Sequence, residues 1–263
     1  MLVAGCDVGS LTAKAVILCD GTVSASHVMR DDASPEASAR KVFQAVLSQA
    51  GLSEDAIQYC VGTGYGRKRI PFVNEVLSEI ACHAMAVKWL LPCARTILDV
   101  GGQDAKAIRL DDQGNVVRYV YNDKCASGTG RFLEIMSTAM EVDLEDLGRK
   151  SLESSCPIKI SNQCTVFAET EVISQMNSGA NLSDIINGLH RAMANRVASL
   201  ARSIEIEEAV VMSGGVAKNV GMYRALEDAL DIQLSQVPSD PQINGALGAA
   251  LFAQERMSQR AVV

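Results

Sequence analysis

The stretch Asp99-Val-Gly-Gly-Gln-Asp-Ala-Lys106 lies between two apolar runs, 96–98 and 107–110. Apolar runs on both sides of a glycine pair predict a strand, a tight turn that opens with an aspartate, and a second strand. A similar stretch, Asp7-Val-Gly-Ser-Leu-Thr-Ala-Lys14, stands near the start of the chain, before the apolar run 15–18. The two stretches share Asp, Val, Gly, Ala and Lys at matching positions. This repeat predicts two related halves, each contributing one glycine turn to a common cleft.

The composition is that of a globular protein with aliphatic cores. Of the 263 residues, 48% are hydrophobic but only 4% are aromatic, so Val, Ile, Leu and Ala must fill the interior. A net charge of −7 without clustered Lys and Arg argues against nucleic-acid binding, and Arg67-Lys-Arg69 is too short to form such a patch. No basic leader and no apolar run of about 18 residues is present, so we expect a cytoplasmic protein without a membrane partner.

The order of apolar runs and turn residues predicts an α/β chain in two halves, 1–92 and 93–263, whose C-terminal helix packs back on the first half. We expect strands at 2–6, 13–19, 22–29, 56–61, 95–99, 105–110, 115–121 and 208–212, and helices at about 35–50, 78–91, 128–141, 165–178, 183–204, 219–230 and 244–257. A polar connection precedes Cys164, and the acidic run 205–208 is interpreted as a solvated helix end. The three histidines are interpreted as packing or surface residues.

A glycine turn after a buried strand lets backbone N–H groups approach a phosphate closely. Asp7 and Asp99, at the strand ends, would hold Mg²⁺ through water. The remaining polar candidates are Ser10, Thr12 and Lys14 for the phosphates and Gln103 and Asp104 for the attacking water. One copy alone is explained as well by a plain β-hairpin turn. The second copy, and a third glycine strand end at 210–218, favour phosphate binding.

Two other glycine patterns are weaker. Neither turn is a P-loop, because G-x-x-x-x-G-K-[ST] is absent. The run Gly62-Thr-Gly-Tyr-Gly66 lacks the final spacing of a dinucleotide fingerprint. We interpret it as a loop, at the hinge between the halves.

Eight cysteines in this chain need an explanation other than a disulfide scaffold. Most are interpreted as small buried hydrophobes, among them Cys6, Cys19, Cys60 and Cys82. The segments 122–131 and 161–169 differ, because each places its cysteine in a polar lead into a helix, where the helix dipole stabilises a thiolate. Two thiolates are too few for a [4Fe–4S] cluster, but a symmetric dimer supplies four. The alternative is a pair of ordinary loop thiols.

The three glycine strand ends resemble the phosphate 1, phosphate 2 and adenosine motifs of the actin–hexokinase–Hsp70 superfamily. The resemblance implies a duplicated ribonuclease-H-like, actin-like ATPase fold with ATP between two halves. It assigns to the first phosphate loop Asp7, Gly9, Ser10, Leu11, Thr12, Ala13 and Lys14, to the second Asp99, Gly101, Gly102, Gln103 and Asp104, and to the adenosine contact Gly214 and Gly215.

The whole chain resembles the activators of 2-hydroxyacyl-CoA dehydratases, in the BadF/BadG/BcrA/BcrD ATPase family. The segments that carry the likeness are 99–104, 122–132, 164–172 and 244–250. The resemblance implies a homodimer in which Cys125 and Cys164 of each copy hold one bridging [4Fe–4S] cluster. It implies ATP/ADP and Mg²⁺ as further cofactors, and ATP-driven one-electron reduction of a partner dehydratase, with ferredoxin or flavodoxin as donor. Cys156 does not match the ligand motif.

Three alternatives remain open from the sequence. The first is the ATPase subunit of a benzoyl-CoA reductase or of a double-cubane-cluster reductase. The second is a small-molecule kinase of the same superfamily, although kinases usually carry larger inserted domains. The third is a nucleotide-binding regulator whose cluster only reports redox state.

Overall fold

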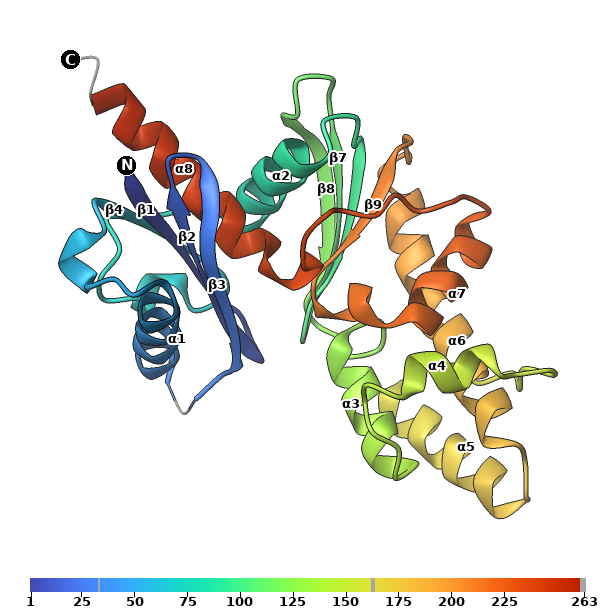
Figure 1. Cartoon of the computed structure of the whole chain (residues 1–263). Coiled ribbons are helices and arrows are strands. Elements are labelled where there is room, and N and C mark those ends of the chain that lie inside the picture. Colours follow the sequence, from blue (N-terminus) through green and yellow to red (C-terminus); the bar gives the residue numbers. More distant parts are fainter. Residues whose placement is uncertain (33, 162–163, 261–263) are drawn as a thin grey trace. The chain divides into compact units, whose positions relative to one another are not determined.

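The computed structural model describes residues 1–32, 34–161 and 164–260. The chain forms two compact units (Figure 1). The first contains Met1–Ala94, Leu110–Val116 and Val237–Val263, and the second contains Arg95–Arg109 and Val117–Gln236. In the described ranges no helix is both long enough and apolar enough to cross a membrane.

The first unit is built on a five-stranded sheet in the order β3-β2-β1-β4-β5. Its strands are β1 (Leu2–Val8), β2 (Thr12–Cys19), β3 (Thr22–Arg30), β4 (Tyr59–Thr63) and β5 (Glu75–Val76). Strands β1, β2 and β3 form an antiparallel meander, and β4 runs parallel to β1. This register places Asp7 opposite both Lys14 and Thr63.

Helices cover both faces of this sheet. Helix α1 (Pro35–Ala50) is capped at its N-terminus by Ser34. Its C-cap residue is Gly51, whose φ of 67° is in the left-handed region. Helices α2 (Glu79–Leu90) and α8 (Asn244–Arg260) pack together on the other face. A Cβ on Gly5 of β1 would lie 2.0 Å from the Ala246 carbonyl oxygen, so α8 lies directly on the strand.

The second unit is built on a four-stranded sheet in the order β8-β7-β6-β9. Its strands are β6 (Thr96–Val100), β7 (Ala105–Leu110), β8 (Val116–Asn122) and β9 (Val210–Ser213). Strand β7 is antiparallel to β6, and β9 is parallel to it, so that Asp99 lies opposite both Lys106 and Ser213. The helices are α3 (Gly130–Ala139), α4 (Leu147–Leu152), α5 (Thr165–Asn177), α6 (Leu182–Arg202) and α7 (Val220–Leu230).

The two units repeat one sequence of elements. In each, three antiparallel strands are followed by a helix, by a strand parallel to the first, and by a 3-10 helix. Those 3-10 helices are η2 (Arg67–Arg69) and η3 (Gly215–Lys218); η1 (Glu54–Ala56) and η4 (Pro241–Ile243) complete the described elements. The second unit has three further helices, α3, α4 and α5, between β8 and α6. The predicted duplicated fold class is confirmed.

Most predicted strands and helices are confirmed within a few residues. The strand predicted from Ala56 begins instead at Tyr59, because the Ile57 amide bonds to Glu54 O and closes the 3-10 turn η1. The connection predicted between 141 and Cys164 contains α4, which the sequence analysis missed because a six-residue helix has too few turns to show a period.

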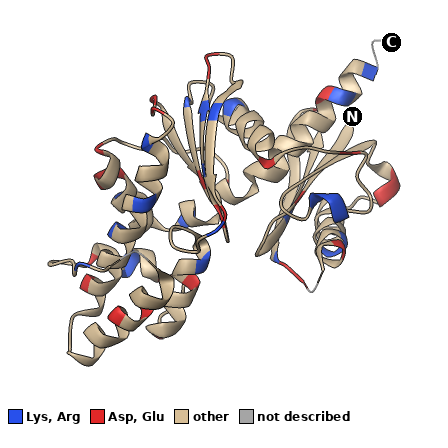
Figure 2. Cartoon of the chain, turned by 180° about the vertical axis from the view of Figure 1, so that it is seen from behind, with Lys and Arg blue, Asp and Glu red and all other residues tan. Residues whose placement is uncertain are grey.

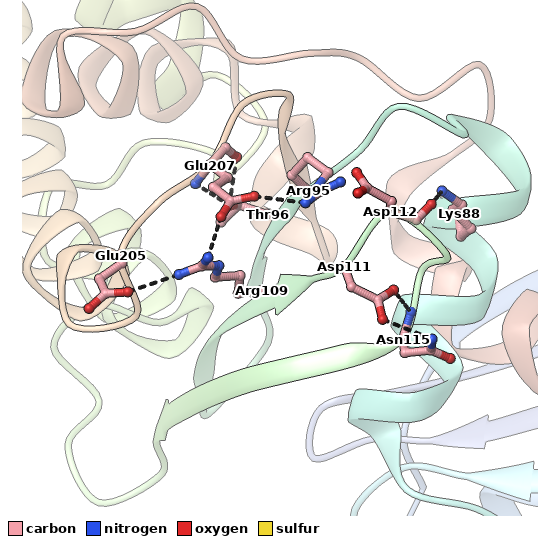
Figure 3. A network of polar contacts seen from close by, with 9 residues as sticks. All are labelled: Lys88, Arg95, Thr96, Arg109, Asp111, Asp112, Asn115, Glu205 and Glu207. Carbon is pink, nitrogen blue, oxygen red and sulfur yellow. Dashed lines mark hydrogen bonds and ion pairs between the residues drawn. The ribbon is translucent and has the colours of Figure 1, made fainter.

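The interpretation of 205–208 as a solvated helix end holds for Glu205 and Glu208, which are exposed just beyond α6, but Glu207 is partly buried and both Glu205 and Glu207 are paired. Arg109 pairs with Glu205 at 2.9 Å and also with Glu207, and Arg95 pairs with Glu207 at 2.9 Å (Figure 3). The Glu207 backbone exchanges hydrogen bonds with the Thr96 hydroxyl at 2.7 and 3.0 Å. These carboxylates therefore fix the segment between α6 and β9 against β6 and β7. Elsewhere, acidic and basic residues are mixed along both units (Figure 2).

Candidate functional site: two matching glycine turns and a cysteine loop

The first predicted phosphate turn joins β1 to β2. The Gly9 amide donates to Thr12 O at 3.0 Å and closes the turn, leaving Ser10 and Leu11 at its tip. Ala13 is buried in β2. Lys14 Nζ lies 3.3 Å from Asp7 Oδ2 and 3.2 Å from Thr12 O. The structure therefore brings all the predicted first-loop residues together around one Asp–Lys pair.

The second predicted turn, between β6 and β7, has the same construction. The Gly101 amide donates to Asp104 O at 2.9 Å, with Gly102 and Gln103 at the tip. Lys106 Nζ lies 3.3 Å from Asp99 Oδ2 and 2.7 Å from Asp104 Oδ2. Gln103 is exposed to solvent, whereas the Asp104 carboxylate forms an ion pair with Lys106. The two candidates for positioning the attacking water therefore differ in how firmly their side chains are held.

Each buried aspartate is also closed in by a glycine with positive φ. Asp7 and Asp99 are only 6% and 3% exposed. A Cβ on Gly64 (φ 96°) would lie 2.2 Å from Val8 O and 2.4 Å from Asp7 Oδ1. A Cβ on Gly214 (φ 84°) would lie 2.4 Å from Val100 O and 2.8 Å from Asp99 Oδ1. Neither position accepts a side chain, so both glycines are required by close approach to the aspartate strand.

Gly64 is a site residue that the sequence analysis missed. The run 62–66 was predicted to be a loop. This is confirmed from Gly64 onward, because Gly62 and Thr63 belong to β4. Cys60-Val-Gly-Thr-Gly64 and Val210-Val-Met-Ser-Gly214 both place a hydroxyl residue and a glycine at the end of an apolar strand. Comparing these two strand ends would have identified Gly64 as the counterpart of the predicted adenosine residue Gly214. Gly215, the other predicted adenosine residue, begins η3.

Two further groups lie at the first aspartate. The Asp31 amide donates to Leu11 O at 3.0 Å, and burial, opposed by Lys14 and reinforced by Asp7, raises the pKa of Asp31. On the other side, a Cβ on Gly245 of α8 would lie 2.6 Å from Asp7 Oδ2 and 3.3 Å from His83 Nε2. The approach of α8 to Asp7 therefore depends on that glycine. Neither Asp31 nor the contact of α8 with Asp7 was predicted, because nothing in the local sequence links these residues to Asp7.

The second turn is joined directly to the start of α3. The Gly130 amide donates to Gly101 O at 2.8 Å, and the Arg131 amide donates to Gly102 O at 2.7 Å. These are the first helical residues of α3, whose amides have no partner within the helix. The carbonyls of the predicted phosphate turn therefore cap the helix that follows the cysteine loop.

Cys125 lies in the loop between β8 and α3. Asn122 Nδ2 donates to Cys125 O at 3.0 Å. A cavity of about 500 Å³ is lined by Asn122 and Gly128, on either side of this cysteine, and by the α6 residue Arg196. Cys164 is the N-cap residue of α5, and Asn162 and Gln163 before it lie outside the described residues.

The eight cysteines fall into three groups by exposure: three are buried, three are exposed (Cys19, Cys93 and Cys156) and two are partly exposed. Cys6, Cys60 and Cys82 are buried, and burial raises the thiol pKa of each, to about 12 for Cys82, so they are unsuited to bind metal as thiolates. Cys19 was expected to be buried but is exposed, because it ends β2 at the turn. Cys125, in the loop before α3, and Cys164, at the start of α5, are partly exposed. In the described part of the chain no three His, Cys, Asp or Glu side chains lie close enough together to hold a metal ion.

Two units with the same strand order, each with an Asp–Lys pair under a glycine turn, define the class: an α/β protein with the actin-like ATPase fold. The profile of the BadF/BadG/BcrA/BcrD ATPase family matches residues 4–253. The chain belongs to this family, and the family predicted from its motifs is confirmed.

Relatives match along their full length. The chain is 44% identical over 264 residues to the activator of lactoyl-CoA dehydratase of Anaerotignum propionicum, covering 99% of this chain and 100% of the relative. It is 40% identical over 257 residues to the (R)-2-hydroxyglutaryl-CoA dehydratase activating ATPase of Acidaminococcus fermentans, covering 97% and 98%. The solved structure of the activator of the 2-hydroxyisocaproyl-CoA dehydratase from Clostridium difficile with bound ADPNP has a TM-score of 0.96 and 41% identity, covering 100% and 98%.

Proposed function

We propose that this protein is an ATP-hydrolysing activator of a 2-hydroxyacyl-CoA dehydratase, to which it passes a low-potential electron. The relatives named above support the ATPase activity and the class of partner. The observation that carries the electron-transfer part is the pair of hydrogen bonds from Gly130 and Arg131 to the carbonyls of Gly101 and Gly102. They connect a predicted phosphate turn to the helix that begins five residues after Cys125.

Each turn would bind phosphate through its backbone N–H groups, and the family resemblance implies that the two turns share one ATP. Asp7 and Asp99 are the groups that would hold Mg²⁺ through water, which is the coordination this ion prefers. Bound Mg²⁺ supplies positive charge that offsets the charge of the transferred phosphoryl group. The residues Gly214 and Gly215 would lie against the adenosine, and Gln103 or Asp104 would orient the attacking water.

Cys125 and Cys164 of two copies would together complete a four-thiolate site, since each copy offers two suitable cysteines. A [4Fe–4S] cluster bound there supplies one-electron redox chemistry. Cys164 is the N-cap residue of α5, at the positive end of that helix dipole, and Cys125 lies in the loop five residues before α3. We expect ferredoxin or flavodoxin as donor and the dehydratase as acceptor, because the chemistry on the acyl-CoA takes place in the partner.

Coupling requires two states that ATP and ADP stabilise differently. If the Gly101–Gly102 backbone moves when ATP is replaced by ADP, the carbonyl oxygens that accept hydrogen bonds from the first α3 amides move with it. Helix α3 and the Cys125 loop would then move together, because Thr129 and Ser127 before the helix are buried and transmit the displacement.

The test uses anaerobically purified, reconstituted full-length protein. Cys164→Ser should lose the cluster absorbance and the ability to activate a purified dehydratase with ATP and a reductant. Cys156→Ser is the matched control, because Cys156 is exposed in the same unit but lies outside the predicted ligand pair. The control should keep about four irons per dimer. A Cys164→Ser dimer that still holds one intact cluster would refute the ligand assignment.

A further inference from the structure

The loop after β4 lies next to Asp7 in the same way that the loop after β9 lies next to Asp99. Both loops begin with a buried hydroxyl residue in register with the aspartate, Thr63 and Ser213. Both continue through a positive-φ glycine that touches the aspartate strand, and both then enter a 3-10 helix that carries basic residues. Since the family resemblance places the β9 loop at the nucleotide, the duplication places the β4 loop there too.

The β4 loop is held rigidly beside the first turn. The Gly66 amide donates to Val8 O at 2.8 Å, directly next to Asp7. The Thr63 hydroxyl donates to Leu77 O at 3.2 Å, which fixes the other end of the loop. A group carried by this loop is therefore pre-positioned with respect to the Asp7 carboxylate.

Arg67 is the group so placed. Its Nη1 donates to Gly64 O at 2.9 Å and lies 3.9 Å from Glu79 Oε1, longer than a close ion pair. The side chain is 32% exposed, so it retains access to a ligand. Burial raises the pKa of the Cys82 thiol to about 12, an effect that Asp7 increases and Arg67 reduces. Because a Cβ on Gly64 would lie 2.4 Å from Asp7 Oδ1, the Gly64 carbonyl holds Arg67 in the same region of the first unit as Asp7.

We propose that Arg67 is a phosphate-positioning residue for ATP hydrolysis, held on Gly64 O so that its other N–H groups contact the terminal phosphate. This rests on the proposed function, which places the phosphates on the Asp7 turn. In hydrolysis, water forms a bond to the γ-phosphorus while the bond to the bridging oxygen breaks and its electron pair leaves with ADP; the proton of the water passes to a phosphate oxygen or to solvent. Arg67 takes no proton in this step. Its planar cation stabilises the charge on the transferred group.

The experiment compares three variants of the full-length, reconstituted protein. Arg67→Gln removes the charge, Arg67→Lys restores it, and Arg69→Gln is the matched control in the same 3-10 turn, since Arg69 is exposed and pairs with Glu36. For Arg67→Gln we expect kcat of ATP hydrolysis to fall by about tenfold to a hundredfold. Its affinity for AMP-PNP should fall more than its affinity for ADP, because only the former carries the terminal phosphate. Arg67→Lys should recover part of both losses, and Arg69→Gln should match wild type.

Two results would overturn the inference. One is an Arg67→Gln variant that hydrolyses ATP as fast as Arg69→Gln. The other is an equal loss of AMP-PNP and ADP affinity that Arg67→Lys does not rescue, which shows that the side chain only holds the loop. Asp7→Asn separates this inference from the proposed function. If Asp7→Asn hydrolyses ATP at the wild-type rate, the phosphate site itself is wrong; if Asp7→Asn is inactive while Arg67→Gln is normal, only the role of Arg67 fails.

Discussion

The two units build the same turn but attach it to different surroundings. In the first, β3 leads after a short segment to α1, and the Asp7 turn contacts the β4 loop, Asp31 and α8. In the second, α3, α4 and α5 stand between β8 and α6, and the Gly101–Gly102 carbonyls bond to α3. The shared part is suited to holding a nucleotide. The added part carries both Cys125 and Cys164, so the proposed redox function depends on the part of the second unit that has no counterpart in the first.

The largest effect is expected at the glycines that make the two turns equivalent. Gly64→Ala and Gly214→Ala each drive a Cβ within about 2.4 Å of a carbonyl oxygen at positive φ. Each should lose about 3 kcal/mol or more of unfolding free energy and most ADP affinity. Chemical denaturation and calorimetry measure both.

Gly179→Ala provides the control for that pair. Its φ is 80°, but nothing lies within 4 Å of an added Cβ, so only the backbone strain of about 1 kcal/mol remains. Equal losses at positions 64, 179 and 214 would show that the contact with the aspartate strand contributes nothing.

The next effect belongs to the second unit alone. His190 of α6 is 1% exposed, its Nε2 lies 3.2 Å from Asn219 Nδ2, and burial lowers its pKa to about 4. Between about pH 4 and pH 6.5, His190 therefore binds a proton in the unfolded chain but not in the folded chain. Stability should rise between pH 4 and pH 6.5, by up to about 3 kcal/mol. His190→Asn should reduce this slope in urea titrations; an unchanged slope would assign it to other groups.

The smallest effect concerns the segment before β9. Glu207→Gln weakens the pairs with Arg95 and Arg109, which are partly exposed, and should cost about 1 kcal/mol or less. The loss should shrink as salt concentration rises, because the pairs are screened. Asp146→Asn, which removes an exposed pair with Arg149, should change stability even less. A larger loss at Asp146 than at Glu207 would contradict the anchoring role.

Most of the secondary structure and the candidate ligand residues could be predicted from the sequence, because the patterns that mark them are local. The repeat at Asp7 and Asp99 and the periodicity of the long helices needed no tertiary information. Gly64, Asp31 and His83 escaped because they reach Asp7 only through strand pairing and helix packing. The ion pairs of Glu205 and Glu207 escaped for the same reason, since Arg95 and Arg109 are about a hundred residues away.

We propose that the predicted phosphate turn of the second unit acts on the cysteine loop through the start of α3. Gly130→Pro removes the N–H that bonds to Gly101 O, while proline is tolerated at the first helical position. Gly130→Ala adds a Cβ and keeps that N–H, so it controls for added bulk. The measurement is the rate at which a chelator removes iron from the reconstituted protein, with ATP and with ADP. We predict that the ratio of the two rates in wild type persists in Gly130→Ala and approaches one in Gly130→Pro, which still hydrolyses ATP. A wild-type ratio in Gly130→Pro would contradict the claim.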